Sequence, residues 1–282
     1  MDGLRDCQGV ESRCWVISKR DGDWIILDHR PLSDREIVER CCLSLTQTYL
    51  EIAKGAKGAH FFEEDDVLGC LSHEVHPAAN FGFIARPTPE SLRMLLRCVH
   101  KSPSFTTYLL PTDQDDAARE LLESRGFTVS NRLQLMYYRG PVRELPDIEP
   151  ERTELHQIGD RFDLVMFLAR QFFSEFDLSF HRSIAMLTAS AKRCQLLAWK
   201  YRTEIVMGAM VTQWGDTLGL YNLAVAPHRR GKGLGQSMVF DFIARHPGDS
   251  ITLQCNQNMV EWYETLGFRH YGTVTVFSAP ED

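Results

Sequence analysis

Residues 153–282 alternate between short apolar runs of strand length and longer stretches whose apolar residues recur with helical period. This pattern predicts a strand at 153–158, helices at 161–176 and 183–191, strands at 196–201, 205–213 and 218–225, a helix at 236–244, a strand at 250–255, a helix at 257–266 and a last strand at 273–277. The predicted order is therefore strand, helix, helix, three strands, helix, strand, helix and strand.

The N-terminal half contains a fainter copy of this order. Its pattern predicts strands at 14–18 and 24–27, a helix at 34–54, strands at 60–62, 67–71 and 81–85, a helix at 90–99, a strand at 105–110 and a helix at 115–124. An acidic turn at 63–66 joins two of these strands. The strand, helix and Gly126-Phe127 that end this half parallel the strand, helix and Gly267-Phe268 of the other half. The two halves are therefore expected to be tandem repeats.

A polar segment rich in proline separates the halves. Pro141, Pro146 and Pro150 lie in it, and prolines within a polar stretch are typical of a linker. We therefore expect an N-terminal domain at 1–140, a linker at 141–152 and a C-terminal domain at 153–282.

The segment between the predicted strand at 218–225 and the following helix is rich in glycine. Gly231, Gly233 and Gly235 remove every second β-carbon, so successive backbone N–H groups can converge on an anion at the positive end of the helix dipole. A dinucleotide fold requires G-x-G-x-x-G and a P-loop requires G-x-x-x-x-G-K-[ST], and this segment matches neither spacing. It is nevertheless typical of a phosphate-binding turn.

Two motifs of this half resemble those of the GNAT superfamily of N-acetyltransferases. Arg230, Gly233 and Gly235 match its motif A, [QR]-x-x-G-x-[GA]. Residues 256–268 resemble its motif B, N-x-x-A-x-x-x-Y-x-x-x-G-F, with Met259 in place of the usual small residue. The resemblance implies an α/β fold of two tandem GNAT-like domains, each a mixed, mostly antiparallel sheet with helices on both faces. It also implies acetyl-CoA as co-substrate.

The resemblance assigns roles to particular residues of the C-terminal half. Its loop amides would hold the pyrophosphate, the strand at 220–225 would separate from the strand at 251–255, and the pantetheine would lie in that gap. The cofactor-binding residues would be Leu223, Ala224, Val225, Arg230, Gly231, Lys232, Gly233, Leu234, Gly235, Gln236 and Asn256. Tyr263 would be the catalytic residue, as proton donor to the departing thiolate, although its alternative role is core packing. Asn256 and Gly267 are also a suitable N-cap and C-cap for the helix between them.

A general base is not evident from the sequence. Several members of the family carry a glutamate near the start of the fourth strand, where this chain has Gly-Leu-Tyr-Asn at 219–222. The carboxylates that could serve from elsewhere are Asp216, Glu204, Glu175 and Asp177. Each of them is better explained as a solvated surface charge.

Composition and charge are those of a globular enzyme. The chain has 282 residues, of which 44% are hydrophobic and 24% charged. The formal net charge of −7 argues against general nucleic-acid binding and is compatible with a cationic amine substrate. The first residues lack the apolar core of a signal peptide, and no stretch approaches the length of a membrane span. We therefore expect a cytoplasmic protein that binds neither nucleic acid nor membranes.

Cysteine and histidine spacing gives no metal site. The eight cysteines form no C-x-x-C pair and are expected to be small buried residues in a reducing compartment. Cys255 ends the strand beside the expected thioester, so a nucleophilic role is its alternative, although a structural role is favoured. His73 and His76 lack a third ligand nearby in sequence, so no metal is expected.

The N-terminal copy lacks the glycine-rich turn. Residues 85–91 contain no glycine and two prolines, which have no N–H to donate, so this half is expected to be structural or to shape the acceptor pocket. The sequence favours direct acetyl transfer to a primary amine of a small molecule or peptide. A catalytically silent acyl-CoA-binding or sensor module and an enzyme for longer acyl donors are the alternatives, and the acceptor and the oligomeric state are left open.

Overall fold

The computed structural model describes residues 14–20, 23–29, 32–111, 115–141 and 143–280. Cys7 and the first residues of the chain, for which no signal peptide is expected, lie outside the described residues, as do residues 21–22 between the first two predicted strands. So do the side chains of residues 14–31 and 115.

The elements of the N-terminal half follow the predicted order, with one addition. They are β1 (Cys14–Arg20), β2 (Asp23–His29), α1 (Asp34–Ala53), β3 (His60–Glu64), β4 (Val67–Leu71), the 3₁₀ helix η1 (Pro77–Ala79), β5 (Phe81–Ile84), α2 (Pro89–Lys101), β6 (Thr106–Leu109), α3 (Asp115–Glu123) and β7 (Thr128–Tyr138). The addition is β7, which the sequence analysis did not predict.

The C-terminal half has every predicted element. They are β8 (Glu151–Glu154), α4 (Ile158–Phe172), α5 (Leu178–Ser190), β9 (Cys194–Tyr201), β10 (Glu204–Trp214), β11 (Thr217–Val225), η2 (Pro227–Arg229), α6 (Leu234–Arg245), β12 (Ser250–Cys255), η3 (Gln257–Met259), α7 (Val260–Thr265) and β13 (Phe268–Ser278). Some boundaries differ: the first strand ends before Ile158, which begins α4 instead. Helix α5 begins earlier than predicted because the Asp177 carboxylate caps it by accepting a hydrogen bond from the N–H of Phe180.

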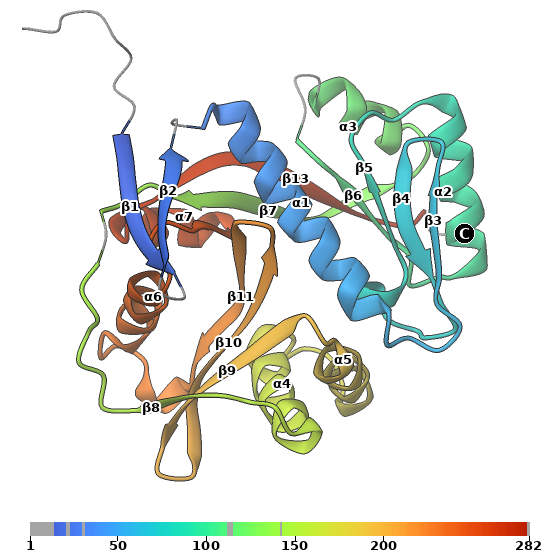
Figure 1. The fold of residues 1–282 in the computed structure, drawn as a ribbon. Coiled ribbons are helices and arrows are strands. Elements are labelled where there is room, and N and C mark those ends of the chain that lie inside the picture. Colours follow the sequence, from blue (N-terminus) through green and yellow to red (C-terminus); the bar gives the residue numbers. More distant parts are fainter. Residues whose placement is uncertain (1–13, 21–22, 30–31, 112–114, 142, 281–282) are drawn as a thin grey trace, which may run out of the picture.

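One 11-stranded sheet, in the order β3-β4-β5-β6-β13-β7-β12-β11-β10-β9-β8, contains strands of both halves (Figure 1). Most neighbours are antiparallel, and the parallel pairs are β5 with β6 and β11 with β12. Strands β1 and β2 form a separate two-stranded sheet. Helices α1, α4 and α5 share one hydrophobic cluster and α6 packs in another, so helices cover both faces of the sheet. The predicted α/β class with a mixed, mostly antiparallel sheet is confirmed.

The last strand of each half lies inside the sheet of the other. Strand β7 lies between β12 and β13, and β13 lies between β6 and β7. The two strands are antiparallel, and their register runs from Thr128 opposite Ser278 to Tyr138 opposite Phe268. The N-terminal half thus supplies a central strand to the sheet that carries the glycine-rich turn.

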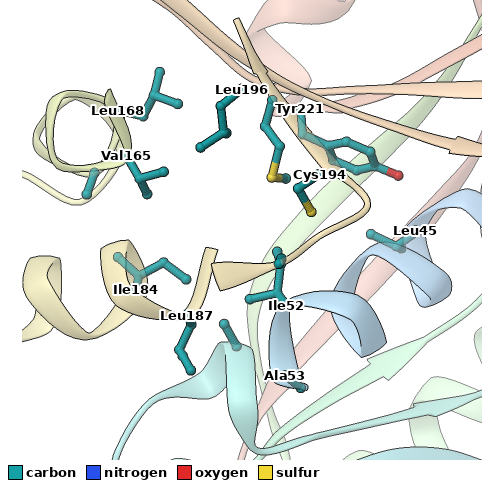
Figure 2. Packing of buried hydrophobic residues seen from close by; sticks show 14 of the residues in the cluster. Leu45, Ile52, Ala53, Val165, Leu168, Ile184, Leu187, Cys194, Leu196 and Tyr221 are labelled. Carbon is teal, nitrogen blue, oxygen red and sulfur yellow. The ribbon is translucent and has the colours of Figure 1, made fainter. Parts of the chain in front are cut away.

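A hydrophobic core joins the two halves beneath α1. Figure 2 shows its side chains turned towards one another. They come from α1 (Leu45, Ile52, Ala53), α4 (Val165, Leu168), α5 (Ile184, Leu187), β9 (Cys194, Leu196) and β11 (Tyr221). Because burial of one large aliphatic side chain is worth about 1.5–3 kcal/mol, this shared core makes α1 a structural part of the C-terminal half.

Candidate functional site

Strands β11 and β12 separate within the C-terminal half. They are paired from Thr217 opposite Ser250 to Leu220 opposite Leu253, and not beyond. On its other side, β11 has a β-bulge at the same level. Met210 of β10 is paired with Tyr221 and Gly208 with Ala224, so two residues of β11 lie opposite one residue of β10. The extra residue places Asn222 at a φ of 50°, in the left-handed region. The ends of the two strands therefore leave a gap flanked by backbone groups without a strand partner.

The turn after β11 exposes a row of backbone donors. Gly231 and Gly233 both have a φ of 75°, and a Cβ at either position would meet nothing within 4 Å. Gly233 is the N-cap of α6 and no side chain caps this helix. The N–H groups of residues 231–236 make no backbone hydrogen bond in the described structure. An uncapped helix start with open space before it is a place where an anion can bind.

Gly235 lies inside the first turn of α6. A Cβ there would lie 3.7 Å from the ring of Trp262 and 3.7 Å from Val225, which are ordinary contact distances. The turn, the end of β11 and the segment after β12 therefore meet at this glycine. A larger side chain would fill the space between them.

The basic residues of the turn are partly engaged. The Arg230 guanidinium donates to the carbonyl of Val225 at 3.0 Å and to Oε1 of Gln171 at 2.9 Å, which braces the turn against β11 and α4. The Arg229 guanidinium lies 3.8 Å from the Glu204 carboxylate and 5.0 Å from the centre of the Tyr201 ring. Lys232 is exposed. Positive charge thus surrounds the open helix start.

Tyr263 lies on α7 and is only 7% exposed. Its ring packs against Trp262 and Phe268, in the hydrophobic cluster that also contains Cys255. Burial raises the pKa of the phenol well above its usual range, with a further contribution from Cys255. The group therefore stays protonated at neutral pH, as a proton donor must.

Cys255 is buried at the end of β12, and burial raises the pKa of its thiol to about 11. A thiol that stays protonated is a poor nucleophile, so its structural role is favoured. Cys41, Cys70, Cys98 and Cys194 are likewise buried and form no disulfide.

The expectation that Asn256 caps the following helix is wrong. The 3₁₀ helix η3 intervenes, and the exposed Asn256 side chain makes no capping hydrogen bond. Gly267 does end α7 as predicted, with a φ of 103°. The Asn256 carboxamide is therefore available for a ligand.

The four carboxylates that could act as a general base contact other groups or lie on an exposed segment. Asp216 pairs with Arg40 at the start of β11, the end opposite to the gap. Glu204 lies 3.1 Å from His228 beside the turn, and Asp177 caps α5. Glu175 lies on the exposed segment between α4 and α5. Gly219, the first residue of the stretch 219–222 that lacks a carboxylate, is covered by the Tyr221 ring.

The corresponding part of the N-terminal half is closed. Strands β5 and β6 are paired to their ends, Ile84 opposite Leu109, and the N–H of Leu110 continues the pairing to the Ile84 carbonyl at 2.8 Å. A capping box between Thr88 and Ser91 satisfies the N-terminus of α2. This half therefore has neither the gap nor the open donors.

Cavities and other clusters lie elsewhere. Two cavities of about 650 and 190 Å³ lie between α2 and the β3–β4 hairpin. Glu64, Arg97 and Lys101 line both of them. Within the described ranges, no three histidine, cysteine, aspartate or glutamate side chains converge as a metal site would require. No described helix is long and apolar enough to cross a membrane.

The sequence did not indicate that Ser44 and Gln254 lie beside Tyr221, near the gap. The Tyr221 hydroxyl lies 2.8 Å from Oγ of Ser44 on α1, and Gln254 of β12 faces the same phenol. No local pattern indicates either contact, because Ser44 and Tyr221 are 177 residues apart.

Comparison with known families agrees with this geometry. Residues 192–270, from before β9 to the start of β13, match the family model "Acetyltransferase (GNAT) domain". A search of curated proteins gave no match.

Solved structures show the same fold at low identity. A GCN5-related N-acetyltransferase from Kribbella flavida is 12% identical, with a TM-score of 0.60 over 89% of this chain and 96% of that chain. A putative acetyltransferase of the GNAT family from Novosphingobium aromaticivorans is 15% identical, with a TM-score of 0.51 over 78% of this chain and 92% of that one.

A tandem arrangement is also found among these structures. A tandem GNAT protein from the clavulanic acid biosynthesis pathway is 12% identical, with a TM-score of 0.52 over 89% of this chain and 98% of that chain. The chain thus has the fold of these GNAT proteins, and its residues 192–270 match the GNAT acetyltransferase family model.

Proposed function

We propose that this chain transfers an acetyl group from acetyl-CoA to a primary amine by direct attack, without a covalent enzyme intermediate. The observation that carries the proposal is the gap between β11 and β12 beside an uncapped start of α6. A gap of this kind suits a pantetheine arm, and the open N–H groups of residues 231–236 suit a pyrophosphate. The family and the fold support acyl transfer in general.

The bound cofactor would supply the activated acyl group as a thioester. Within this site, the amides of Leu223, Ala224 and Val225 would face the pantetheine and the thioester oxygen, and the Asn256 carboxamide would contact the pantetheine. Preorganised backbone donors stabilise the oxyanion that develops during attack on a carbonyl.

Tyr263 would give its proton to the departing thiolate. Its raised pKa keeps the phenol protonated, and it lies in the same cluster as Cys255 at the end of the gap. The amine would lose its proton to water, because the four carboxylates considered are engaged or lie on exposed segments. Proximity then supplies much of the rate enhancement.

Acetyl-CoA binding followed by CoA release tests the proposal. Acetyl-CoA at about a hundredfold over its dissociation constant should stabilise the protein by roughly 2.7 kcal/mol, which a thermal-shift measurement detects. CoA release should then depend on added primary amine. Binding without release for any amine would favour the second candidate, a silent acyl-CoA-binding module, which the absence of a carboxylate from residues 219–222 also favours.

The remaining assignments follow from the same proposal. The acceptor is an amine on a small molecule or peptide, and nucleic acid and membranes are not partners. The location is the cytoplasm, where acetyl-CoA is available. Longer acyl-CoAs in the thermal-shift assay test the acyl chain that the gap accepts.

A further inference from the structure

The face of the gap opposite to Tyr263 carries polar groups. Side chains alternate along a strand, so Cys255 and Gln254 of β12 point to opposite faces of the sheet. Cys255 lies in the cluster with Tyr263. Gln254 faces the phenol of Tyr221, which belongs to the core beneath α1. If the thiolate takes its proton from Tyr263 on one face, the amine approaches from the face of Gln254.

Gln254 carries a buried donor without a partner. Its Nε2 atom is buried and meets no hydrogen-bond geometry with any described residue, although the amide lies close enough to the Tyr221 phenol to lower the pKa of that group. The residue follows Leu253, the last residue of β12 that is paired with β11. A buried polar group left unpaired is costly, and such groups are rare in folded proteins. This donor therefore lies at the inner end of the gap, where a ligand could satisfy it.

The side chains that act on the neighbouring Tyr221 phenol are uncharged. Tyr221 is 9% exposed, and burial raises its pKa to about 12 although Ser44, Thr48 and Gln254 oppose the shift. The Ser44 hydroxyl fixes the phenol at 2.8 Å. A carboxylate placed among such groups would lack a cation and would pay a large desolvation cost. A neutral oxygen is the acceptor that suits this donor.

We propose that the acceptor substrate is an α-amino amide, such as a peptide N-terminus, whose carbonyl oxygen accepts a hydrogen bond from Nε2 of Gln254. This inference rests on the proposed acetyl transfer. The amine nitrogen forms the new bond to the acetyl carbon, the carbon–sulfur bond breaks, the sulfur takes the proton of Tyr263, the amine proton leaves to water, and Tyr263 regains a proton from water. Gln254 orients the acceptor, and Ser44 of the N-terminal half positions Tyr221 beside it.

Matched pairs of amines test this inference. The probes are the amides of glycine, alanine and phenylalanine, each compared with the amine in which hydrogen replaces the carboxamide: methylamine, ethylamine and phenethylamine. CoA release is measured at several pH values, because the paired amines differ in pKa. The protein should prefer the amides in kcat/KM, and Gln254→Leu should reduce this preference about tenfold, the value of one neutral hydrogen bond.

Thr252→Val is the matched control. Thr252 also carries a buried hydroxyl without a partner on β12, but it lies where the strands are still paired, opposite Gly219. Thr252→Val should leave the preference unchanged, and acetyl-CoA affinity by calorimetry should be the same in Gln254→Leu as in the parent. Thermal unfolding checks that both variants are folded.

The outcomes separate this inference from the proposed function. Equal turnover of amides and amines, or a preference that survives in Gln254→Leu, overturns the inference and leaves acetyl transfer standing. A second outcome is weaker acetyl-CoA binding in Gln254→Leu with an unchanged preference for amides. This result would assign the Gln254 donor to the pantetheine and would also overturn the inference. If acetyl-CoA binds and no amine releases CoA, the proposed function fails and the inference fails with it.

Discussion

Oε1 of Glu51 accepts a hydrogen bond of 3.0 Å from the backbone N–H of Arg193, so a side chain of α1 holds the turn that leads into β9. Oε2 of the same carboxylate pairs with Lys54 at 2.6 Å. Glu51 is 4% exposed, and it connects the two halves beside their shared core.

The Glu51 contact predicts a pH-dependent contribution to stability. Burial raises the pKa of Glu51, but the hydrogen bonds from Lys54 and Arg193 outweigh it and hold the pKa below the reference value of 4.5. A carboxylate with a depressed folded-state pKa stabilises the fold above its unfolded pKa, and the stabilisation is lost as the pH falls through the folded pKa. Glu51→Gln should therefore lower the free energy of unfolding by about 1 kcal/mol at pH 7, and the difference should be smaller at pH 3.

Urea unfolding at both pH values measures this difference. Lys54 is 59% exposed, so Lys54→Ala should cost less than Glu51→Gln. A Glu51→Gln effect of equal size at pH 3 and pH 7 would mean that the charge of Glu51 is not its cause.

A side chain at the start of α6 should block the cofactor. Gly235→Val should abolish acetyl-CoA binding in calorimetry with little loss of stability, because the new side chain fills the space between Trp262 and Val225 at the open helix start. Binding like that of the parent would remove this turn as the pyrophosphate site.

Gly233→Ala has a matched control in Gly215→Ala. Both glycines have positive φ and open space around a Cβ, so both substitutions should cost about 1–2 kcal/mol of stability. Only Gly233→Ala should weaken acetyl-CoA binding, since Gly215 lies in the turn between β10 and β11.

Removal of the Tyr263 hydroxyl should affect chemistry and not binding. Tyr263→Phe keeps the packing against Trp262 and Phe268. It should lower kcat about 10²-fold and leave acetyl-CoA affinity nearly unchanged, provided that product release does not limit the rate. Tyr271→Phe, on β13, is the control that should not change kcat. An unchanged kcat in Tyr263→Phe would leave this residue with a packing role only.

Each chain should bind one acetyl-CoA. The capping box of Thr88 and Ser91 and the closed pairing of β5 with β6 leave no second site of the same kind. Titration calorimetry of the intact chain should therefore give a stoichiometry of one. A value of two would show that the N-terminal half also binds the cofactor.

Cleavage of the chain near Pro146 should not separate the halves. Because β7 and β13 each pair within the other half, the fragments should stay together in gel filtration and retain acetyl-CoA binding. Residues 151–282 expressed alone lack β7 and should be insoluble or unable to bind. A soluble and binding-competent C-terminal fragment would contradict this expectation.

The sequence predicted elements that local signals define. Strand β12 was predicted at its observed bounds, and the turn at 63–66 was confirmed, because apolar runs and turn residues specify both. Strand β7 was missed, although Leu133, Leu135 and Tyr137 alternate in it as in a strand. Its partners lie in the distant part of the chain, so no neighbouring element completes a recognisable unit.

In the candidate site, as in the fold, local motifs were predictable and contacts between distant parts of the chain were not. The glycine-rich turn and Tyr263 are local motifs. The Asn256 cap was wrong because a 3₁₀ turn intervenes, and the contact between Ser44 and Tyr221 depends on how α1 crosses the sheet. An unpaired donor such as Nε2 of Gln254 becomes visible only when every neighbouring atom is placed.

The exchange of β7 and β13 has a consequence for synthesis on the ribosome. Strand β6 pairs with β13, from Thr106 opposite Ser278 to Leu109 opposite Thr275, so this edge of β6 stays uncovered until residues 275–278 have been translated. The N-terminal half therefore cannot complete its sheet as an early, independent unit. Its final folding step is set by the emergence of β13, and a chain that stalls before β13 should expose two strand edges to aggregation or to chaperones.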